Sequence, residues 1–373
     1  MTSRREVLTG AAAAALGWNV CVPASGAEAP LSDAASDAPM TITADGAVVP
    51  IILHGRQTQG TLDTGASHTV VDAAFAREVG LLAQEPVAVG GAFGSLSGAM
   101  SHQTHLQIGG RGVAISPIVV DLSASGLGVP VIVGADFFRA GPVRFDFGAN
   151  LFRMLEPTPA GGRIDGYEVP LGRSSRAILQ LSAQVDGNPV LLGLDTGSQT
   201  ALILPAIAGG DRPESTWVTA DITGWRVHAV RSASVTIGGT ELSRVPASVI
   251  DAATEGLIGL PALSRFNITL DMAHERIWFA PLPSVSQPFP RDRLGLAMIP
   301  GEQGLAVVHV AANSPAWKAG FVIEDQIVKV DDEAVTDETA SRLRRTGRGP
   351  VGAVVKLETA SGAVRFVELA EYF

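Results

Sequence analysis

Cysteine is nearly absent from this chain, with a single residue, Cys21, in 373 positions. One thiol close to the N-terminus excludes a disulfide framework and a cysteine-rich zinc site for the rest of the chain. It also leaves the remainder without a cysteine nucleophile. Stability must therefore come from packing, and any catalysis must come from other side chains.

Charge is also scarce. Asp, Glu, Lys and Arg make up 17% of the residues, and the net charge is −10. Lys and Arg do not cluster among aromatic residues, so the sequence predicts no nucleic-acid partner. Neither a Gly-x-Ser-x-Gly elbow nor a phosphate-cradling Gly-Lys-Ser/Thr loop occurs. His102 and His105 point to opposite faces if they lie in a strand, so we expect no metal site and no cofactor there.

Apolar residues, glycine and proline are abundant: 46% of the residues are apolar, with 42 Gly and 23 Pro. Few long helical periodicities appear. This balance is typical of sheets joined by tight turns, and the length allows two or three domains. We predict a mostly β fold.

The first 27 residues look like an export signal rather than part of a fold. Arg4 and Arg5 resemble a twin-arginine motif, Leu8 to Leu16 is a short Ala-rich apolar stretch, and Ser25-Gly26-Ala27 offers a small-residue cleavage site. The apolar stretch is too short to span a bilayer comfortably. We therefore expect a periplasmic or secreted protein with no stable membrane span in its mature form; an ordinary N-terminal helix is the alternative.

Two Asp-Thr-Gly triplets stand 132 residues apart, at Asp63-Thr64-Gly65 and Asp195-Thr196-Gly197. A single triplet indicates only a turn, but the surroundings repeat as well. An apolar run ending in Gly follows each triplet, at Val131-Ile132-Val133-Gly134 and at Leu257-Ile258-Gly259. Ile-Gly-Gly occurs midway in both copies. The sequence therefore contains two diverged copies of one domain-sized unit.

This order of motifs resembles the aspartic protease fold, and each copy is closer in length to a retropepsin protomer than to a pepsin lobe. The resemblance covers residues 40 to 282. It implies a bilobal double-β-barrel with a pseudo-twofold axis, in which residues 40–156 form the first lobe and 165–282 the second. Pro-rich linkers separate the lobes from each other and from the C-terminal part.

Two adjacent carboxylates that share one proton can activate a water and polarise a carbonyl group. The resemblance assigns these roles to Asp63 and Asp195. Thr64 and Thr196 are then expected to reach across to the opposite lobe. Gly65 and Gly197 are expected to let the backbone approach the facing carboxylate and donate an N–H to it. Ser198 stands where the first copy has Ala66; since a hydroxyl there favours ionisation, we predict that Asp195 is the charged partner and Asp63 the protonated one.

A Gly-rich segment in each copy is expected to form a flap. The first is Gly90–Gly98, with Ala92, Phe93 and Gly94 near its centre, and the second is Ile222–Val227, with Trp225. A pepsin-like flap usually carries a tyrosine, and neither segment has one. Two retropepsin-like flaps are therefore the better prediction, although the second segment also fits a surface hairpin with no role.

Residues 290–373 look like a separate PDZ-like α+β module of the type found in bacterial exported proteases. Its most specific stretch runs from Asn313 to Asp331. The resemblance implies a loop of backbone N–H groups that holds the C-terminal carboxylate of a peptide or protein partner. We assign that loop to Leu294, Gly295, Leu296 and Ala297.

Two functions follow from these observations. The first is an exported aspartic endopeptidase that cleaves extended polypeptide substrates, with the PDZ-like module serving recruitment or regulation. The second is a catalytically inactive protein that binds peptides in the same cleft. Two intact triplets favour the enzyme, because a binder has no need of two carboxylates that share a proton. An enzyme that becomes active only after self-cleavage is a third possibility.

Overall fold

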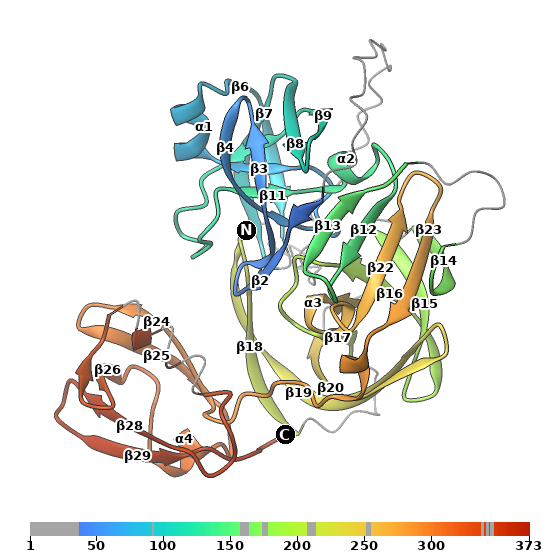
Figure 1. Ribbon diagram of the computed structural model, residues 1–373. Coiled ribbons are helices and arrows are strands. Elements are labelled where there is room, and N and C mark those ends of the chain that lie inside the picture. Colours follow the sequence, from blue (N-terminus) through green and yellow to red (C-terminus); the bar gives the residue numbers. More distant parts are fainter. Residues whose placement is uncertain are drawn as a thin grey trace, which may run out of the picture.

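The computed structural model describes residues 37–91, 93–156, 164–173, 178–206, 214–250, 255–336, 339–340, 343 and 347–373. The expected leader, residues 1–27, and Ala92 of the first flap lie outside these ranges. Within them, strands predominate over helices and form three sheets. The predicted mostly β fold, with two lobes and a PDZ-like domain, is confirmed (Figure 1).

The first lobe contains a short helix whose ends the sequence specifies. Asp72 accepts hydrogen bonds from the backbone N–H groups of Ala74 and Phe75, and Gly80 ends the helix in the left-handed region at φ 74°. The elements of this lobe are β2 (Thr41–Thr43), β3 (Gly46–Leu53), β4 (Arg56–Leu62), β5 (Val70–Asp72), α1 (Ala73–Val79), β6 (Ala83–Gly90), β7 (Ser95–Ser101), β8 (Thr104–Ile108), β9 (Arg111–Ile115), β10 (Ile118–Val120), β11 (Val131–Val133) and α2 (Ala135–Phe138).

The second lobe repeats this plan with longer strands. Its elements are β15 (Leu179–Val185), β16 (Asn188–Asp195), β17 (Leu202–Pro205), β18 (Ser215–Asp221), β19 (Gly224–Ile237), β20 (Thr240–Ile250), β21 (Gly256–Gly259) and α3 (Leu260–Leu263). The repeated Ile-Gly-Gly motif closes equivalent hairpins, β8–β9 and β19–β20. Both glycines of each motif have positive φ, between 54° and 84°, as a type I′ turn requires.

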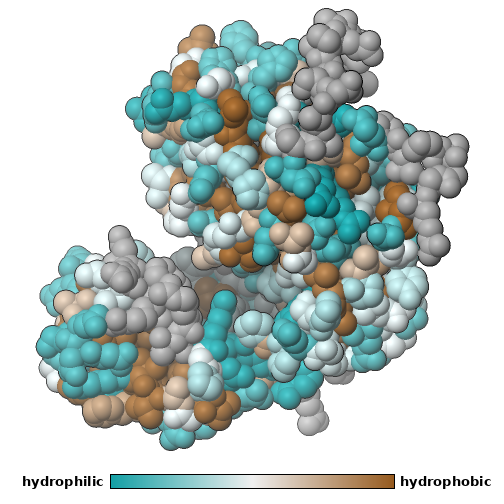
Figure 2. Space-filling view, viewed as in Figure 1, coloured by the Kyte–Doolittle hydropathy of each residue, from teal (hydrophilic) through white to brown (hydrophobic). Residues whose placement is uncertain are grey.

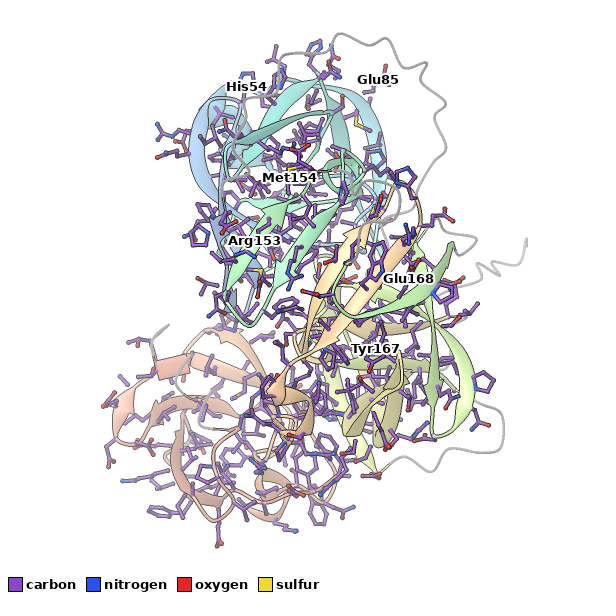
Figure 3. The ribbon with its side chains drawn as sticks, turned by 45° about the vertical axis from the view of Figure 1, so that its right-hand side comes forward. His54, Glu85, Arg153, Met154, Tyr167 and Glu168 are labelled. Atoms are coloured by element: carbon purple, nitrogen blue, oxygen red, sulfur yellow. The ribbon has the colours of Figure 1, made fainter. Side chains whose placement is uncertain are left out.

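Strands from both lobes share the largest sheet. It begins with β1 (Ala38–Pro39), β13 (Leu151–Met154), β12 (Val143–Asp146), β22 (Phe266–Asp271), β23 (Arg276–Pro281) and β14 (Tyr167–Arg173), and then continues through the strands of the second lobe to β18. Within it, β12 pairs antiparallel with β22, one strand from each lobe. Figure 3 shows Arg153 and Met154 on β13 and Tyr167 and Glu168 on β14, on opposite sides of that pair.

Aromatic side chains fill the core beside this sheet. Six phenylalanines are fully buried there: Phe137, Phe138, Phe145, Phe152, Phe266 and Phe279. They come from α2 and from the shared strands of both lobes, so one continuous core supports both Asp-Thr-Gly turns. Fixing the lobes to one sheet fixes the distance between those turns.

The C-terminal domain has its own core, which includes Leu305, Val307, Ile327, Val355 and Leu357. It projects from the second lobe, and a notch separates it from the first lobe (Figure 2). After the 3-10 turn η1 (Pro283–Ser286), its elements are β24 (Leu296–Gly301), β25 (Gly304–Val310), α4 (Pro315–Lys318), β26 (Gln326–Val330), β27 (Glu333–Ala334), β28 (Val354–Thr359) and β29 (Val364–Glu368). No helix among the described residues is long and apolar enough to cross a bilayer.

Candidate active site

Each Asp-Thr-Gly turn follows the end of a buried strand. That strand pairs with the apolar strand that comes later in the same lobe, β11 in the first lobe and β21 in the second. In the first lobe, β11 lies parallel to β4, and the N–H of Asp63 donates to the carbonyl of Val133 at 2.9 Å. In the second, β21 lies parallel to β16 and pairs Asp195 with Gly259. Because the neighbouring strands are anchored in the core, each carboxylate starts from a rigid backbone position.

Thr64 and Thr196 lock the two turns together. The N–H of Thr64 donates to the hydroxyl of Thr196 at 3.0 Å, and the N–H of Thr196 donates to the hydroxyl of Thr64 at 3.1 Å. Each hydroxyl in turn donates across the axis, from Thr64 to the carbonyl of Leu194 at 3.0 Å and from Thr196 to that of Leu62 at 2.8 Å. Four buried hydrogen bonds therefore join the lobes directly beneath the carboxylates.

The two glycines bring each carboxylate against the opposite turn. A Cβ atom on Gly65 would lie 2.7 Å from Cγ of Asp195, and one on Gly197 would lie 2.4 Å from Cγ of Asp63. Any side chain at either position would collide with the facing carboxyl group. The structure thus brings Asp63 and Asp195 together across the pseudo-twofold axis.

Backbone N–H groups hold both carboxylates in matching positions. Asp63 accepts from Gly65 at 2.8 Å and from Ala66 at 3.1 Å. Asp195 accepts from Gly197 and Ser198, both at 2.9 Å. These bonds run to the carboxylate of the same lobe, because each tight turn points its N–H groups back at its own first residue. The N–H of Gly197 also hydrogen-bonds the facing Asp63 and lowers its pKa, as the sequence led us to expect.

The two carboxyl groups differ in their surroundings. Asp195 is fully buried, whereas Asp63 retains some exposure. Burial raises the pKa of both, and the charge of Asp63 raises the pKa of Asp195 further, to well above its ordinary value. Asp195 is therefore the better holder of the shared proton and Asp63 the better anion.

The assignment made from the sequence ran in the opposite direction. It relied on a hydroxyl bond from Ser198 to Asp195. The Ser198 hydroxyl instead donates to the carbonyl of Thr200 and accepts from its N–H, both at 3.3 Å. With its hydroxyl directed into its own loop, Ser198 contributes only its backbone N–H to Asp195, and Ala66 supplies the same bond to Asp63.

A support behind the first turn escaped the sequence analysis. Asp136 in α2 accepts from the N–H and from the hydroxyl of Thr69, both at 2.8 Å. The same hydroxyl accepts from the N–H of Gly134 at 3.2 Å. The second copy has Pro261 at the equivalent place, so this clamp belongs to the first lobe alone. An acidic residue two positions after the apolar-Gly run was the only signal that could have indicated it.

The two predicted flaps meet at their tips. The N–H of Phe93 donates to the hydroxyl of Thr223 at 3.3 Å, and Arg226 donates to the Phe93 carbonyl at 3.4 Å. The Phe93 ring also stacks on His228 at 5.5 Å between centroids. A Cβ atom added at Gly94 would lie 3.7 Å from Thr223, whereas Trp225 is exposed on the second hairpin. The second segment is thus a partner of the first flap and not an isolated surface hairpin.

Thr223 is a further flap residue that the sequence analysis missed. Asp221 holds it by accepting from its N–H and its hydroxyl, both at 2.7 Å. Ile222 beside it packs against an apolar cluster of the first lobe that includes Ala66, Val89 and Ile118. The tip of the second flap therefore reaches the flap of the first lobe and the cluster that surrounds its catalytic turn.

The four residues assigned to the peptide-binding loop lie at the start of the C-terminal domain. Leu294 is buried and its carbonyl accepts from the N–H of Ala316 at 3.0 Å. Gly295 has φ 83°, and Leu296 and Ala297 begin the edge strand β24. Among the described residues, no group of three or more His, Cys, Asp or Glu side chains is arranged to hold a metal ion.

Two family models match parts of the chain. Residues 49–140 match the family described as gag-polyprotein putative aspartyl protease, and residues 307–360 match the PDZ domain. No curated protein matches this sequence. The first match covers the strand, turn, flap and short helix of the first lobe. Together the matches confirm the predicted resemblance to a retropepsin-like aspartic protease with a C-terminal PDZ domain.

Proposed function

We propose that this retropepsin-like protein with its PDZ domain is an aspartic endopeptidase that hydrolyses peptide bonds with a water held between Asp63 and Asp195. The observation that carries the proposal is the mutual approach of each carboxyl group to the glycine of the opposite turn. Burial and the charge of its neighbour raise the pKa of Asp195 more than that of Asp63, which favours Asp195 as the holder of the shared proton. One proton shared by two acids is the state that this chemistry needs.

In the proposed reaction, Asp63 takes a proton from the water as its oxygen attacks the peptide carbonyl carbon. Asp195 donates its proton to the carbonyl oxygen, and a gem-diol forms without a covalent bond to the protein. The C–N bond then breaks as Asp63 gives its proton to the leaving nitrogen and Asp195 takes a proton from a gem-diol hydroxyl, which re-forms the C=O bond and restores the dyad. The backbone N–H groups that hold both carboxylates keep them in position throughout.

The closed contact between the flaps supports an extended polypeptide as the substrate. The two flap tips, one from each lobe, meet above the catalytic turns. A polypeptide must therefore enter when the flaps part, and it is enclosed when the flaps meet. Apolar residues around the first turn favour apolar segments of that polypeptide. This arrangement gives both flaps a role in substrate binding, with Phe93, Gly94 and Trp225 on them.

The test is digestion of a denatured protein by the purified protein, with the products identified by mass spectrometry. We expect cleavage that Asp63→Asn abolishes. Asp121→Asn is the matched control, because Asp121 is an exposed carboxylate of the same lobe. If all three proteins leave the substrate intact from acid to neutral pH, the inactive peptide-binding protein becomes the better account.

We also propose that the enzyme works outside the cytoplasm after export by the twin-arginine pathway. The support is the pairing of Arg4 and Arg5 with a short apolar stretch and a small-residue cleavage site. Replacing both arginines with lysine should retain the protein inside the cell in a fractionation experiment. Unchanged export of that variant would point to another route.

A further inference from the structure

A pocket lies between β18 of the second lobe and the PDZ domain. Its one wall is β18, which contributes Trp217 and Val218, and its other wall is the PDZ loop and the start of β24, with Leu296 and Ala297. Figure 1 shows β18 running from the flap end of the molecule down to the C-terminal domain. A single strand therefore borders both the flap that covers the dyad and the PDZ domain.

Both walls of the pocket are edge strands. Among the strands that the structure describes, β18 ends the large protease sheet and pairs only with β19, and β24 ends the PDZ sheet and pairs only with β25. An edge strand offers backbone N–H and C=O groups to an added extended peptide. A peptide that extends the PDZ sheet at β24 would therefore touch Trp217 of the protease lobe at the same time.

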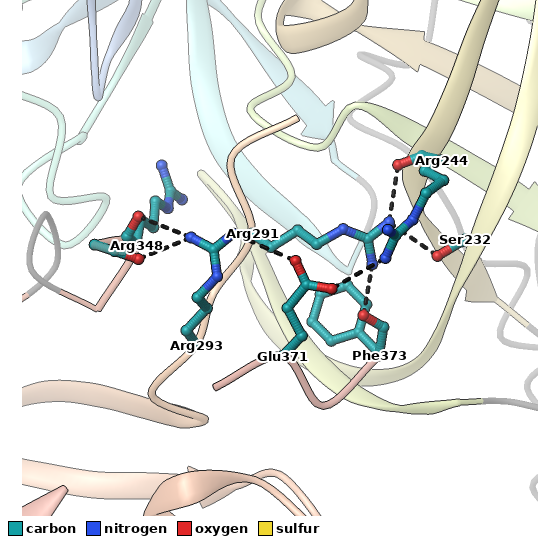
Figure 4. A network of polar contacts seen from close by, with 8 residues as sticks. Ser232, Arg244, Arg291, Arg293, Arg348, Glu371 and Phe373 are labelled. Carbon is teal, nitrogen blue, oxygen red and sulfur yellow. Dashed lines mark hydrogen bonds and ion pairs between the residues drawn. The ribbon is translucent and has the colours of Figure 1, made fainter. Parts of the chain in front are cut away.

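The two walls are held in a fixed relationship. The Thr216 hydroxyl hydrogen-bonds Nε2 of His309 at 3.1 Å, and the Ser215 hydroxyl donates to the carbonyl of Ala312 at 3.2 Å. Close by, the buried guanidinium of Arg291 donates to the Ser232 hydroxyl and the Arg244 carbonyl, both at 2.9 Å, and to Phe373 at 2.6 Å (Figure 4). The pocket is therefore built into the fold.

An internal carboxylate already occupies the loop that was expected to hold a peptide C-terminus. Asp292 accepts from the N–H of Gly295 at 2.6 Å and from the hydroxyl of Tyr372 at 2.6 Å. Asp292 also lines the pocket, so its carboxyl group faces any ligand, and burial raises its pKa. A terminal carboxylate entering this loop would find the Gly295 N–H already taken and would meet a second carboxyl group, and both effects oppose its binding.

We propose that the pocket between β18 and β24 binds an internal, extended segment of a polypeptide, and that Asp292 excludes free C-termini from it. This inference rests on the proposed function, because it takes the ligand to be a polypeptide substrate of the protease. It narrows that substrate to internal segments. The specificity comes from a repulsive element, the Asp292 carboxylate, placed where a free C-terminus would otherwise be held.

The test uses decapeptides tiled from a denatured milk casein, each made with a free C-terminal carboxylate and with a C-terminal amide. Binding to the full-length Asp63→Asn protein is followed by fluorescence anisotropy, so that cleavage plays no part. We expect the amide forms to bind at least five-fold more tightly than the acids. Trp217→Ala should weaken the amide forms about five-fold or more, because it removes the protease wall of the pocket.

Asp292→Asn should bring the acid-to-amide ratio of dissociation constants close to one, since an amide side chain keeps acceptors for Gly295 and Tyr372 but loses the charge. The matched control is Glu302→Gln, an exposed carboxylate between β24 and β25, which should leave the ratio unchanged.

The ratio in the protein with Asp292 intact tests the inference even if Asp292→Asn folds poorly. Preference for free acids, an unaltered ratio in Asp292→Asn, or no binding of either form overturns it. A protein that binds amides but cleaves nothing contradicts the proposed protease alone.

Discussion

Thr64 and Thr196 exchange hydrogen bonds across the pseudo-twofold axis, each backbone N–H donating to the hydroxyl of the other at 3.0 and 3.1 Å. Both residues are buried, and their hydroxyls also donate to carbonyls of the opposite lobe. The carboxylates beside them are thus positioned by side chains that take no part in proton transfer.

Replacing Thr64 with Val should destabilise the protein by about 2 kcal/mol, because it leaves the Leu194 carbonyl and the Thr196 N–H buried without a partner. Thr64→Ser keeps the hydroxyl, so its free energy of unfolding should fall much less. Chemical denaturation of both variants measures the difference. Equal losses would show that the methyl group and not the hydrogen bonds supports the axis.

The pH dependence of kcat/KM should be bell-shaped. Activity requires Asp63 ionised and is lost as pH falls through its pKa; it requires Asp195 protonated and is lost as pH rises through its pKa. Both pKa values are raised, that of Asp195 most. The active range should therefore extend above the pH at which an ordinary Asp ionises. A rate that rises steadily to alkaline pH would contradict this account.

The dyad should also affect stability. A carboxyl group whose pKa is raised by folding stabilises the folded state at low pH, and that contribution is lost as pH rises through the folded pKa. Asp195→Asn removes a carboxyl group that is costly to ionise in its buried site, so it should increase the free energy of unfolding at neutral pH more than at pH 4. Denaturation curves at the two pH values give the difference. A variant less stable than the parent at neutral pH would indicate that the pair is not strained by ionisation.

Contact between the flap tips should contribute to substrate binding. Thr223→Ala removes the acceptor for the Phe93 N–H and the hydroxyl that Asp221 holds. We expect kcat/KM to fall about three- to ten-fold, the equivalent of roughly one hydrogen bond, while Thr223→Ser stays near the parent value. Steady-state kinetics on one peptide substrate separates the two. An unchanged Thr223→Ala enzyme would mean that the tips meet without helping catalysis.

Much of the fold could be predicted because the two copies carry the same motifs in the same order. Ile-Gly-Gly alone is a weak turn signal, but its occurrence in both copies predicted two equivalent hairpins. Both motifs adopt the same turn, with positive φ at each glycine. The resemblance to the aspartic protease fold predicted that Asp63 and Asp195 face each other, because the pseudo-twofold axis relates equivalent positions of the two lobes.

Contacts between segments without equivalents could not be predicted. The Asp136 clamp on Thr69 depends on how α2 packs behind the first turn, and no second copy of it exists. The Ser198 hydroxyl had two acceptors within reach, and local loop geometry chose the Thr200 carbonyl. Asp292 precedes the PDZ loop by only a few residues, yet its bond to Gly295 depends on a tight turn that residue types alone do not specify.

The most direct test of the paired carboxylates is to measure kcat/KM for Asp63→Asn, Asp195→Asn and the double variant on one peptide. Residues that act as a unit give non-additive losses. We predict that either single substitution lowers kcat/KM at least 1,000-fold, on the order expected for loss of acid–base catalysis, and that the double variant loses no more. Substantial activity in either single variant, or losses that multiply in the double variant, would show that the two acids do not share one reaction.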